Sequence, residues 1–492
     1  MKEKERGILP QKIKGFRDID SDLNQLRWNI INKAKEVYKS YGFEQLDTPI
    51  LEYADTLGKY MPDKESVEEG IYSFQNPEKE PVYLKNGEEM RDENENVIME
   101  NHFLALRYDL TAPLSRFYAE KLWKEYLRGN IKDGKAPLFR RYQFGQVFRY
   151  ELKLTPGRFR EFWQLDFDTI GTADVSADAE VCIILADALE KIGLKRKTYI
   201  VKVNNRKILK GFLQAIGINS ENDEQNILRI IDKFDKIGFE NVKKELMEGR
   251  TDDSGSEIKG IGMAKDTVEK KIYNEGIEEL EKMHFIWKNL NFSEERIIFD
   301  CILVRGMAYY TGPIFEVESL QTYKDKKGRK RNVGSICGGG RYDNLVKNLL
   351  GIKVPATGAS IGVDRLSELL TLTKQVPEKE IGSVFITVFD DELMPEYQKI
   401  ARSLREKNIK TEIFYGFQRN LKKQLKYADR KNSPIAIMLG SNELEKGIVT
   451  VKDLRMGRKM QNIKDKKIWR EKVQFQVKRE KLIEKVLELL KY

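Results

Sequence analysis

The residues best suited to chemistry lie at positions 301–318, in the sequence CILVRGMAYYTGPIFEVE. Arg305 offers a planar guanidinium that can bind a phosphate or carboxylate through two parallel hydrogen bonds. The adjacent hydroxyls of Tyr309 and Tyr310 suit a small, planar, polar group. A hairpin whose arginine pairs with a surface carboxylate and whose tyrosines pack would explain the stretch equally well. It therefore indicates a binding site only in combination with other segments.

A second chemical block covers residues 137–171, where aromatic and apolar residues alternate with polar ones. The alternation predicts two antiparallel strands joined by a loop around Thr155–Gly157. Arg149 and Glu151 share a face of the first strand, while Gln164, Asp166 and Asp168 share a face of the second. A solvated sheet edge is the alternative. We expect a site, because several charges on one buried face are costly without a ligand.

Two glycine-containing segments complete the candidate site. Gly338, Gly339 and Gly340 precede Arg341-Tyr342-Asp343, and three consecutive glycines indicate either a close approach of the backbone to a ligand or a turn. Residues 356–370 form a strand of small residues that runs into a helix. The first turns of that helix carry Asp364 and Arg365.

The hydrophobic pattern predicts the elements that must position these residues. Predicted helices cover 23–41, a segment ending at 126, 177–192, 395–407 and 421–431. Predicted strands cover 43–51, 103–107, 384–389, 410–414 and 435–439. From residue 384 onward strands alternate with helices, which predicts a mostly parallel sheet. Pro49 removes a backbone donor, which favours a sheet edge or a subunit boundary for its strand. We expect a hairpin-like insertion at 76–101 and a mostly helical inserted domain between 208 and 290.

Composition limits the class of protein. The 492 residues are 40% hydrophobic and 34% charged, without a run long enough to cross a bilayer and without a secretory signal. Three cysteines without a CxxC pair and only two histidines argue against a disulfide framework, a cysteine zinc site and a histidine-rich metal site. We assign no metal ligands.

The net charge of +10 is concentrated near the C-terminus, where residues 451–492 contain 14 basic and 6 acidic side chains. A basic surface is typical of RNA-binding modules, because neutralised phosphates dominate their affinity. A solvated lysine-rich helix is the commoner source of such charge. The excess alone therefore does not decide between the two.

Five ordered blocks closely resemble histidyl-tRNA synthetases, which are class II aminoacyl-tRNA synthetases. They are the helix and strand with Pro49 (motif 1), LRYDLTAP at 106–113, Phe148-Arg149 through Gln164 (motif 2), RGMAYYTGPIFE with GGGRYD, and GASIGVDRL (motif 3). The paired tyrosines are the part that looks specific to histidine. The resemblance covers almost the whole chain.

The resemblance implies an α+β and α/β multidomain fold, with a class II antiparallel sheet flanked by helices. The implied domains are a catalytic domain at 1–206 and 292–372, a helical insertion at 207–291, a linker at 373–382 and an α/β anticodon-binding domain at 383–492. The implied reaction activates L-histidine with ATP and Mg²⁺ and transfers it to histidine tRNA. A cytoplasmic homodimer with a contact through Pro49, and no membrane association, is implied as well.

Site residues follow by position in the family's motifs. The catalytic residues would be Arg149 and Arg305. Histidine would be bound by Asp109, Leu110, Thr111, Arg149, Gln164, Asp168, Arg305, Tyr309 and Tyr310. ATP would be bound by Arg149, Glu151, Arg158, Arg160 and Arg365. The ligands of Mg²⁺ are not assigned.

Three departures resemble a divergent bacterial branch of the family. The motif 2 loop has residues 152–156, LKLTP, where Arg-Pro-Gln is frequent, so the reading of an extra 5′ guanosine on the tRNA is in doubt. Tyr108-Asp109 replaces Pro-Glu, and Ala308 replaces an aspartate beside the tyrosines. None of these changes removes a group that the chemistry requires.

Two alternatives were weighed. A synthetase-like regulatory subunit of ATP phosphoribosyltransferase would share the catalytic body but lack the C-terminal domain, which residues 422–440 and 449–458 resemble. A synthetase for another amino acid of the same subclass would fit the ATP groups but not the tyrosine segment. The sequence favours the histidine enzyme over both.

Overall fold

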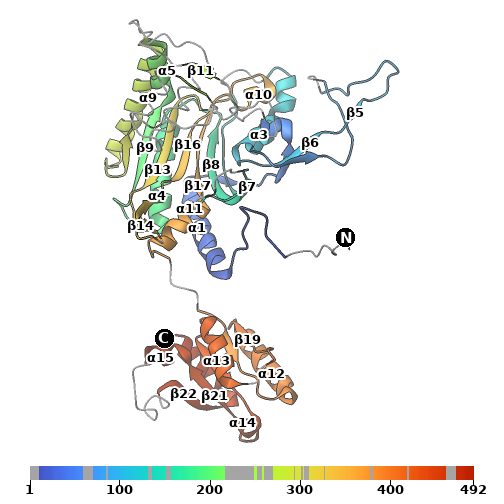
Figure 1. The fold of residues 1–492 in the computed structure, drawn as a ribbon, viewed down its shortest axis with the longest axis vertical. Coiled ribbons are helices and arrows are strands. Elements are labelled where there is room, and N and C mark those ends of the chain that lie inside the picture. The colour runs from blue at the N-terminus through green and yellow to red at the C-terminus, as the bar shows by residue number, and fades with distance from the viewer. Residues whose placement is uncertain are drawn as a thin grey trace, which may run out of the picture. The chain divides into compact units, whose positions relative to one another are not determined.

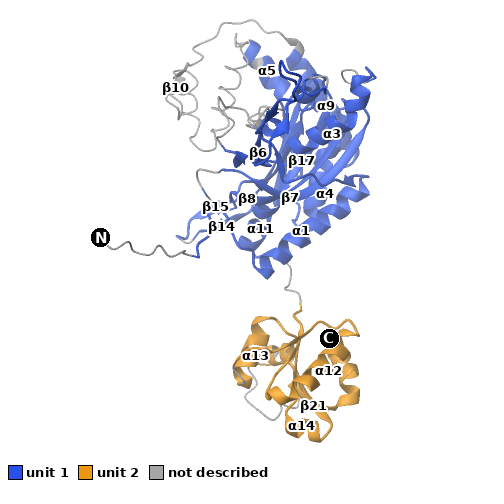
Figure 2. Ribbon diagram, turned by 90° about the vertical axis from the view of Figure 1, so that its right-hand side faces the viewer, with its two compact units in different colours: residues 1–376 blue, residues 377–492 orange. Residues whose placement is uncertain are grey.

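A computed structural model describes most of the chain in two compact units, Met1–Val376 and Pro377–Tyr492 (Figure 2). The described residues are 10–58, 70–84, 87–130, 136–150, 154, 157–215, 249–251, 257–259, 270–292, 294–300, 303, 310–325, 327–376, 381–417, 420–460 and 472–491. The division falls inside the segment 373–382 that we expect to be a linker. The other domain boundaries stay predictions.

The first unit is built on an eight-stranded sheet with the order β1-β7-β8-β17-β16-β13-β9-β12 (Figure 1). Its strands are β1 (Glu44–Gln45), β7 (Phe139–Phe148), β8 (Glu161–Ile170), β17 (Ala356–Gly362), β16 (Ser335–Arg341), β13 (Pro313–Ser319), β9 (Tyr199–Asn205) and β12 (Ile297–Phe299). The six central strands pair antiparallel, and the two edge strands pair parallel. The antiparallel pair that the alternation predicts is confirmed as β7 and β8.

Helices cover one face of this sheet (Figure 1). They are α1 (Ser21–Ser40), α4 (Ser176–Ile192), α9 (Lys270–Asn289) and α11 (Val363–Leu372). The Asp20 carboxylate caps α1 by accepting a hydrogen bond from the backbone N–H of Leu23, and Ile30 and Ala34 are buried against the sheet. The opposite face of the sheet carries the polar rows described below.

The predicted strand at 43–51 is two strands, which corrects that prediction. β1 joins the large sheet, while β2 (Leu51–Tyr53) joins a small sheet with β6 (Phe103–Leu106) and β3 (Ser73–Gln75). Pro49 lies in the connection. Arg107 fixes that connection, because its guanidinium donates to the carbonyls of Thr48 at 2.7 Å and Pro49 at 3.4 Å.

The insertion at 76–101 is a hairpin that branches. Strands β4 (Glu80–Pro81) and β5 (Met99–Glu100) close its stem. Backbone bonds from Val82 to Ile98, from Met90 to Val82 and from Ile98 to Met90 then join three chain segments in a ring. Two shorter hairpins extend from this ring. The hairpin prediction holds in outline; Asn86 of the predicted turn lies outside the described residues.

The expected inserted domain is only partly described. Its described parts are α5 (Arg206–Ala215), a hairpin of β10 (Gly249–Thr251) and β11 (Glu257–Lys259), and α9. Leu280, Met283 and Trp287 of α9 are buried in the same cluster as the main sheet. Helix α9 thus packs against the main sheet of the first unit. The remaining elements of this unit are α2 (Ala54–Gly58), α3 (Thr111–Leu127), α10 (Lys347–Leu350), and a hairpin of β14 (Thr322–Lys324) and β15 (Lys330–Asn332).

The second unit has a five-stranded sheet in the order β19-β18-β20-β21-β22. Its strands are β18 (Val384–Ile386), β19 (Thr411–Ile413), β20 (Ile435–Met438), β21 (Ile448–Asp453) and β22 (Gln474–Lys478). Its helices are η1 (Asp391–Leu393), α12 (Met394–Arg405), α13 (Leu421–Arg430), α14 (Ser441–Glu445), α15 (Leu454–Lys459), η2 (Arg479–Lys481) and α17 (Leu482–Leu490). Two strand pairs are parallel and two antiparallel, so the expectation of a mostly parallel sheet is wrong. None of the helices among the described residues could span a membrane.

Candidate active site

The register of the large sheet places the candidate residues in rows on one face. Arg141 on β7 lies opposite Asp168 on β8, which lies opposite Gly358 on β17 and then Gly340 on β16. The next row contains Gln143, Asp166, Ser360 and Gly338 in the same order. Residues two apart on a strand share a face, so both rows face the same space. Charged and polar groups at one end of each row thus stand beside glycines at the other.

The glycines keep this face open. A methyl group at Gly358 would overlap the Asp168 carboxylate, and one at Gly340 would lie 2.7 Å from Cδ1 of Tyr310. Tyr310 itself is buried, in a cluster with Tyr342. Gly340 and Gly358 form a glycine strip that leaves room for the Asp168 carboxylate and for Tyr310, and a larger residue at either position would clash with them.

Asp168 is held from two sides. The Tyr342 hydroxyl donates to Oδ1, and Nη2 of Arg141 lies 2.9 Å from Oδ2. The same Nη2 donates to the carbonyl of Leu110 at 2.9 Å. The side chains of Arg141 and Asp168 are 0% and 3% exposed, so this ion pair is shielded from water.

Three carboxylates, those of Asp109, Asp166 and Asp168, act on one another in this buried space. Burial raises the pKa of Asp166 to about 7; Arg141 opposes that rise, and Asp168 and Asp109 add to it. Burial likewise raises the pKa of Asp168, again opposed by Arg141. An added positive charge would favour the ionised forms, so the site is electrostatically suited to a cationic ligand group.

Asp109 and its neighbours lie at the start of α3. Oδ1 of Asp109 accepts from the backbone N–H groups of Thr111 at 3.1 Å and Ala112 at 2.9 Å, which satisfies donors that a helix start leaves open. Asp109, Leu110 and Thr111 are all buried. Gln164 donates through Nε2 to the Ser360 hydroxyl at 2.9 Å.

Several buried polar atoms around this space accept or donate no hydrogen bond within the described part of the chain. They are Nε and Nη1 of Arg141, Oε1 of Gln164, Oδ1 of Asp166 and, apart from its ion pair, Oδ2 of Asp168. Buried polar groups normally have partners. Their convergence on one face points to a ligand with both donors and acceptors.

Arg149 directly follows β7, the strand that carries Arg141. Its Nε donates to the Tyr108 carbonyl at 3.1 Å, and its guanidinium lies 4.3 Å from the centre of the Tyr108 ring and 5.2 Å from that of Phe162. Because Tyr108 directly precedes Asp109, these contacts hold Arg149 close to Asp109. The guanidinium is half-buried, and its charge can reach a ligand over that face.

The predicted ATP residues divide into two groups. Arg365, whose guanidinium donates to the Ser335 carbonyl, packs beside Gly157 at the end of the motif 2 loop, and Arg158 next in sequence is exposed. Arg160 instead is buried: it donates to the Lys14 carbonyl at 3.4 Å and lies over the Tyr150 ring. Glu151, Arg305 and Tyr309 lie outside the described residues.

The sequence did not single out Arg141, Tyr342 or Ser360 as functional. Arg141 had one usable signal, since it lies opposite Asp168 in the predicted strand pair. Asp364 also has a role that we did not predict: its carboxylate accepts from Arg17, from Arg27 at 3.1 Å and from the backbone N–H of Trp163 at 2.6 Å. It joins the N-terminal segment to β8 and α11.

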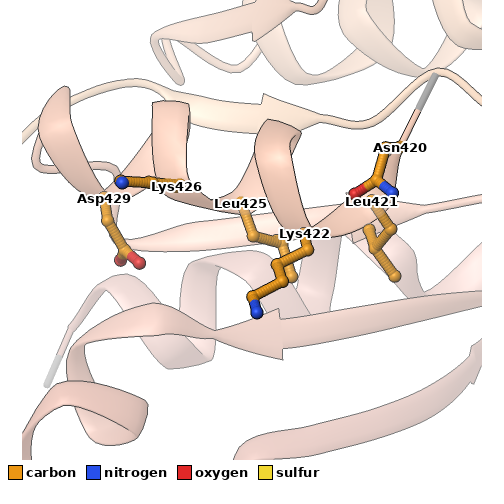
Figure 3. Close-up of a pocket in the computed structure, with 6 residues that line it drawn as sticks. All are labelled: Asn420, Leu421, Lys422, Leu425, Lys426 and Asp429. Carbon is orange, nitrogen blue, oxygen red and sulfur yellow. The ribbon is translucent and has the colours of Figure 1, made fainter. Parts of the chain in front are cut away.

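A separate pocket lies along helix α13 in the second unit (Figure 3). It is lined by Asn420, Leu421, Lys422, Leu425, Lys426 and Asp429. Its two lysines make it suitable for a phosphate-bearing ligand. Within the described residues, no group of three or more histidine, cysteine, aspartate or glutamate side chains could hold a metal ion.

Comparison with known proteins identifies the family. The family model for histidyl-tRNA synthetase matches residues 97–366, and the model for an anticodon binding domain matches residues 383–489. Histidine–tRNA ligase from Ruegeria sp. (strain TM1040) is 40% identical over 97% of this chain and 95% of its own length. The enzyme of the same name from Paracoccus denitrificans (strain Pd 1222) is 39% identical over 97% of both chains.

Solved structures with a similar fold include a histidyl-tRNA synthetase. Histidyl-tRNA synthetase from Nostoc sp. PCC 7120 has a TM-score of 0.65 and 26% identity, covering 98% of this chain and all of its own. An ATP phosphoribosyltransferase regulatory subunit/histidyl-tRNA synthetase from Bacillus halodurans, at 21% identity and a TM-score of 0.59, shares the fold. The chain therefore belongs to the histidyl-tRNA synthetase family.

Proposed function

We propose that this chain is a histidine–tRNA ligase that activates L-histidine with ATP and transfers it to the 3′ end of histidine tRNA. In the first step the histidine carboxylate attacks the α-phosphorus, and the bond to pyrophosphate breaks. In the second a hydroxyl of the terminal ribose attacks the carbonyl carbon of histidyl-adenylate, and AMP leaves. Curated relatives at about 40% identity over nearly the full chain support this assignment.

The sheet face with Asp166, Asp168 and the glycine strip is the observation that carries the proposal. Asp109, Thr111 and Gln164 would bind the α-ammonium group, with Leu110 holding the start of α3 in place. Asp168, Tyr309 and Tyr310 would read the imidazole ring. A polar pocket of this kind rejects ligands that lack the matching groups by factors of about 10⁴–10⁵, so no editing site is needed.

Arg149 and Arg305 would stabilise the charge that develops on the α-phosphate and carboxylate. Glu151, Arg158, Arg160 and Arg365 would bind the rest of ATP, among which Arg160 is constrained by its contact with the N-terminal segment. This is catalysis by positioning and electrostatics, without a protein nucleophile. Mg²⁺ would be held by the phosphates of ATP and would offset their charge; the described side chains supply no ready-made set of ligands.

The second unit would bind the tRNA. Support comes from the match of residues 383–489 to an anticodon binding domain, from the pocket with Lys422 and Lys426, and from the basic C-terminal region. A regulatory subunit without a tRNA substrate has no use for such a domain, which weighs against that alternative. We place the reaction in the cytoplasm, where tRNA is charged.

We further propose a homodimer. Leu51, Tyr53 and Phe74 on the small β2-β6-β3 sheet are each more than 40% exposed, and neighbouring exposed apolar residues extend this surface. Apolar surface of this kind commonly marks an interface between proteins. Pro49 lies two residues before β2, so the contact expected at motif 1 would extend this surface.

Replacement of Arg305 tests the catalytic step. Arg305→Ala should lower the rate of histidine-dependent ATP–pyrophosphate exchange by about 10²–10³, the usual cost of removing one transition-state donor. Arg128→Ala is the matched control, because Arg128 is exposed at the end of α3 and pairs with Glu125. A variant that kept a near wild-type exchange rate would show that Arg305 has a different role.

A further inference from the structure

Arg141 is the one fully buried guanidinium among the described residues of the acidic face, and no motif of the sequence points to it. We propose that Arg141 is a positioning residue for histidine recognition, which holds the Asp168 carboxylate ionised and oriented toward the imidazole of the substrate. The inference rests on the proposed function, and it assigns a specificity role to a residue on β7, one strand away from Asp168.

The first argument is geometric. The Asp168 carboxylate lies over Gly358 of β17, in the space that a methyl group at that position would occupy. Tyr342 holds Oδ1, and Arg141 holds Oδ2 from the β7 side at 2.9 Å. The Leu110 carbonyl in turn fixes the guanidinium at 2.9 Å. The carboxylate is thus locked in one orientation while one lone pair of Oδ2 stays available.

The second argument is electrostatic. The groups that face Asp168 from the described elements are Arg141 on β7, Asp166 on β8, Asp109 before α3, Tyr342 after β16 and Tyr38 from α1 on the far side. Two of these are carboxylates and two are phenols, so Arg141 supplies the positive charge among them. Without it, a buried carboxylate next to two others would take up a proton.

The third argument concerns the unused donors. Nε and Nη1 of Arg141 are buried and have no hydrogen-bond partner within the described part of the chain, and Oδ1 of Asp166 also lacks one. A residue that served packing alone would not keep two charged donors unpaired at such a cost. These donors suit an acceptor atom of the ligand, while the ionised Asp168 keeps Oδ2 available for a ligand N–H.

The test compares substitutions at two adjacent arginines. Arg141→Leu should raise the histidine KM by about 10- to 100-fold, the usual effect of losing a partner that supports a ligand-holding side chain. The ATP KM should stay within about twofold of the wild-type value, because distant sites usually couple only weakly. Arg140→Leu is the matched control, because Arg140 points to the opposite face, where it pairs with Glu180 and lies over Phe43. It should leave both KM values unchanged.

Three further readouts separate positioning from a general loss of structure. The acidic limb of the pH profile of 1/KM for histidine should move to higher pH in Arg141→Leu, because Asp168 then loses its proton only at higher pH. Arg141→Lys, which keeps the charge, should recover part of the loss. In an Asp168→Asn background, Arg141→Leu should add no further increase in the histidine KM.

The outcomes distinguish this inference from the proposed function. If the wild-type chain shows no histidine-dependent exchange, the proposed function itself fails. If the wild-type chain is active but Arg141→Leu matches Arg140→Leu, or if the histidine and ATP KM values rise together, Arg141 has no positioning role. Multiplicative effects of Arg141→Leu and Asp168→Asn would also overturn the inference, because they would show that the two residues act separately.

Discussion

At the scale of single residues, the site depends on charged side chains that are buried where a ligand would bind. Asp168 lies in a place that favours its protonated form, since burial raises its pKa; among the described residues, Arg141 and a hydrogen bond from Tyr342 oppose this. The ionised carboxylate is the stronger acceptor for an imidazole N–H. The balance between desolvation and these two partners therefore sets how well the site reads its substrate.

Asp168→Ala should raise the histidine KM much more than the ATP KM. The variant loses the acceptor for the ring but keeps Arg149, which would contact the phosphate. Steady-state exchange kinetics with each substrate varied in turn would measure the two constants. Equal increases in both would refute the assignment of Asp168 to the imidazole.

At the scale of elements, strand register brings the site together. The period-two pattern of β8 predicted correctly that Gln164, Asp166 and Asp168 share a face. It did not identify Arg141: alternation places Arg141 on the face of Arg149, but its position opposite Asp168 follows only from the register of β7 with β8. Tyr342 was beyond prediction as well, since its contact with Asp168 joins residues 174 positions apart. Pro49 marks the interruption between β1 and β2, which the prediction of a single strand over 43–51 missed.

Asp364 is a junction between elements, because its carboxylate contacts the N-terminal segment, α1 and β8 from its place on α11. Asp364→Asn should lower the free energy of unfolding by about 3–5 kcal/mol, since it leaves the largely buried guanidinium of Arg27 without its carboxylate. Chemical denaturation would measure the change. Glu120→Gln is the control, because Glu120 is exposed in its pair with Arg116 and should cost less than about 1 kcal/mol. Equal losses in the two variants would show that Asp364 is not such a junction.

At the scale of the whole molecule, the proposed roles divide between the two units. The residues proposed for adenylate formation all belong to the first unit, and the second provides the match to an anticodon binding domain. The split between the two units falls within the polar segment 373–382, and the predicted domain boundaries otherwise stay predictions. The sequence predicted the mixed sheet of the second unit poorly, since the direction of short apolar strands depends on long-range pairing.

Histidine-dependent ATP–pyrophosphate exchange by the full chain tests the central claim most directly. The account predicts that exchange requires histidine, that the other standard amino acids support less than about 10⁻⁴ of that rate, and that addition of histidine tRNA yields histidyl-tRNA. Exchange that did not depend on histidine, or that another amino acid supported equally well, would contradict the reading of this sheet face as a histidine site.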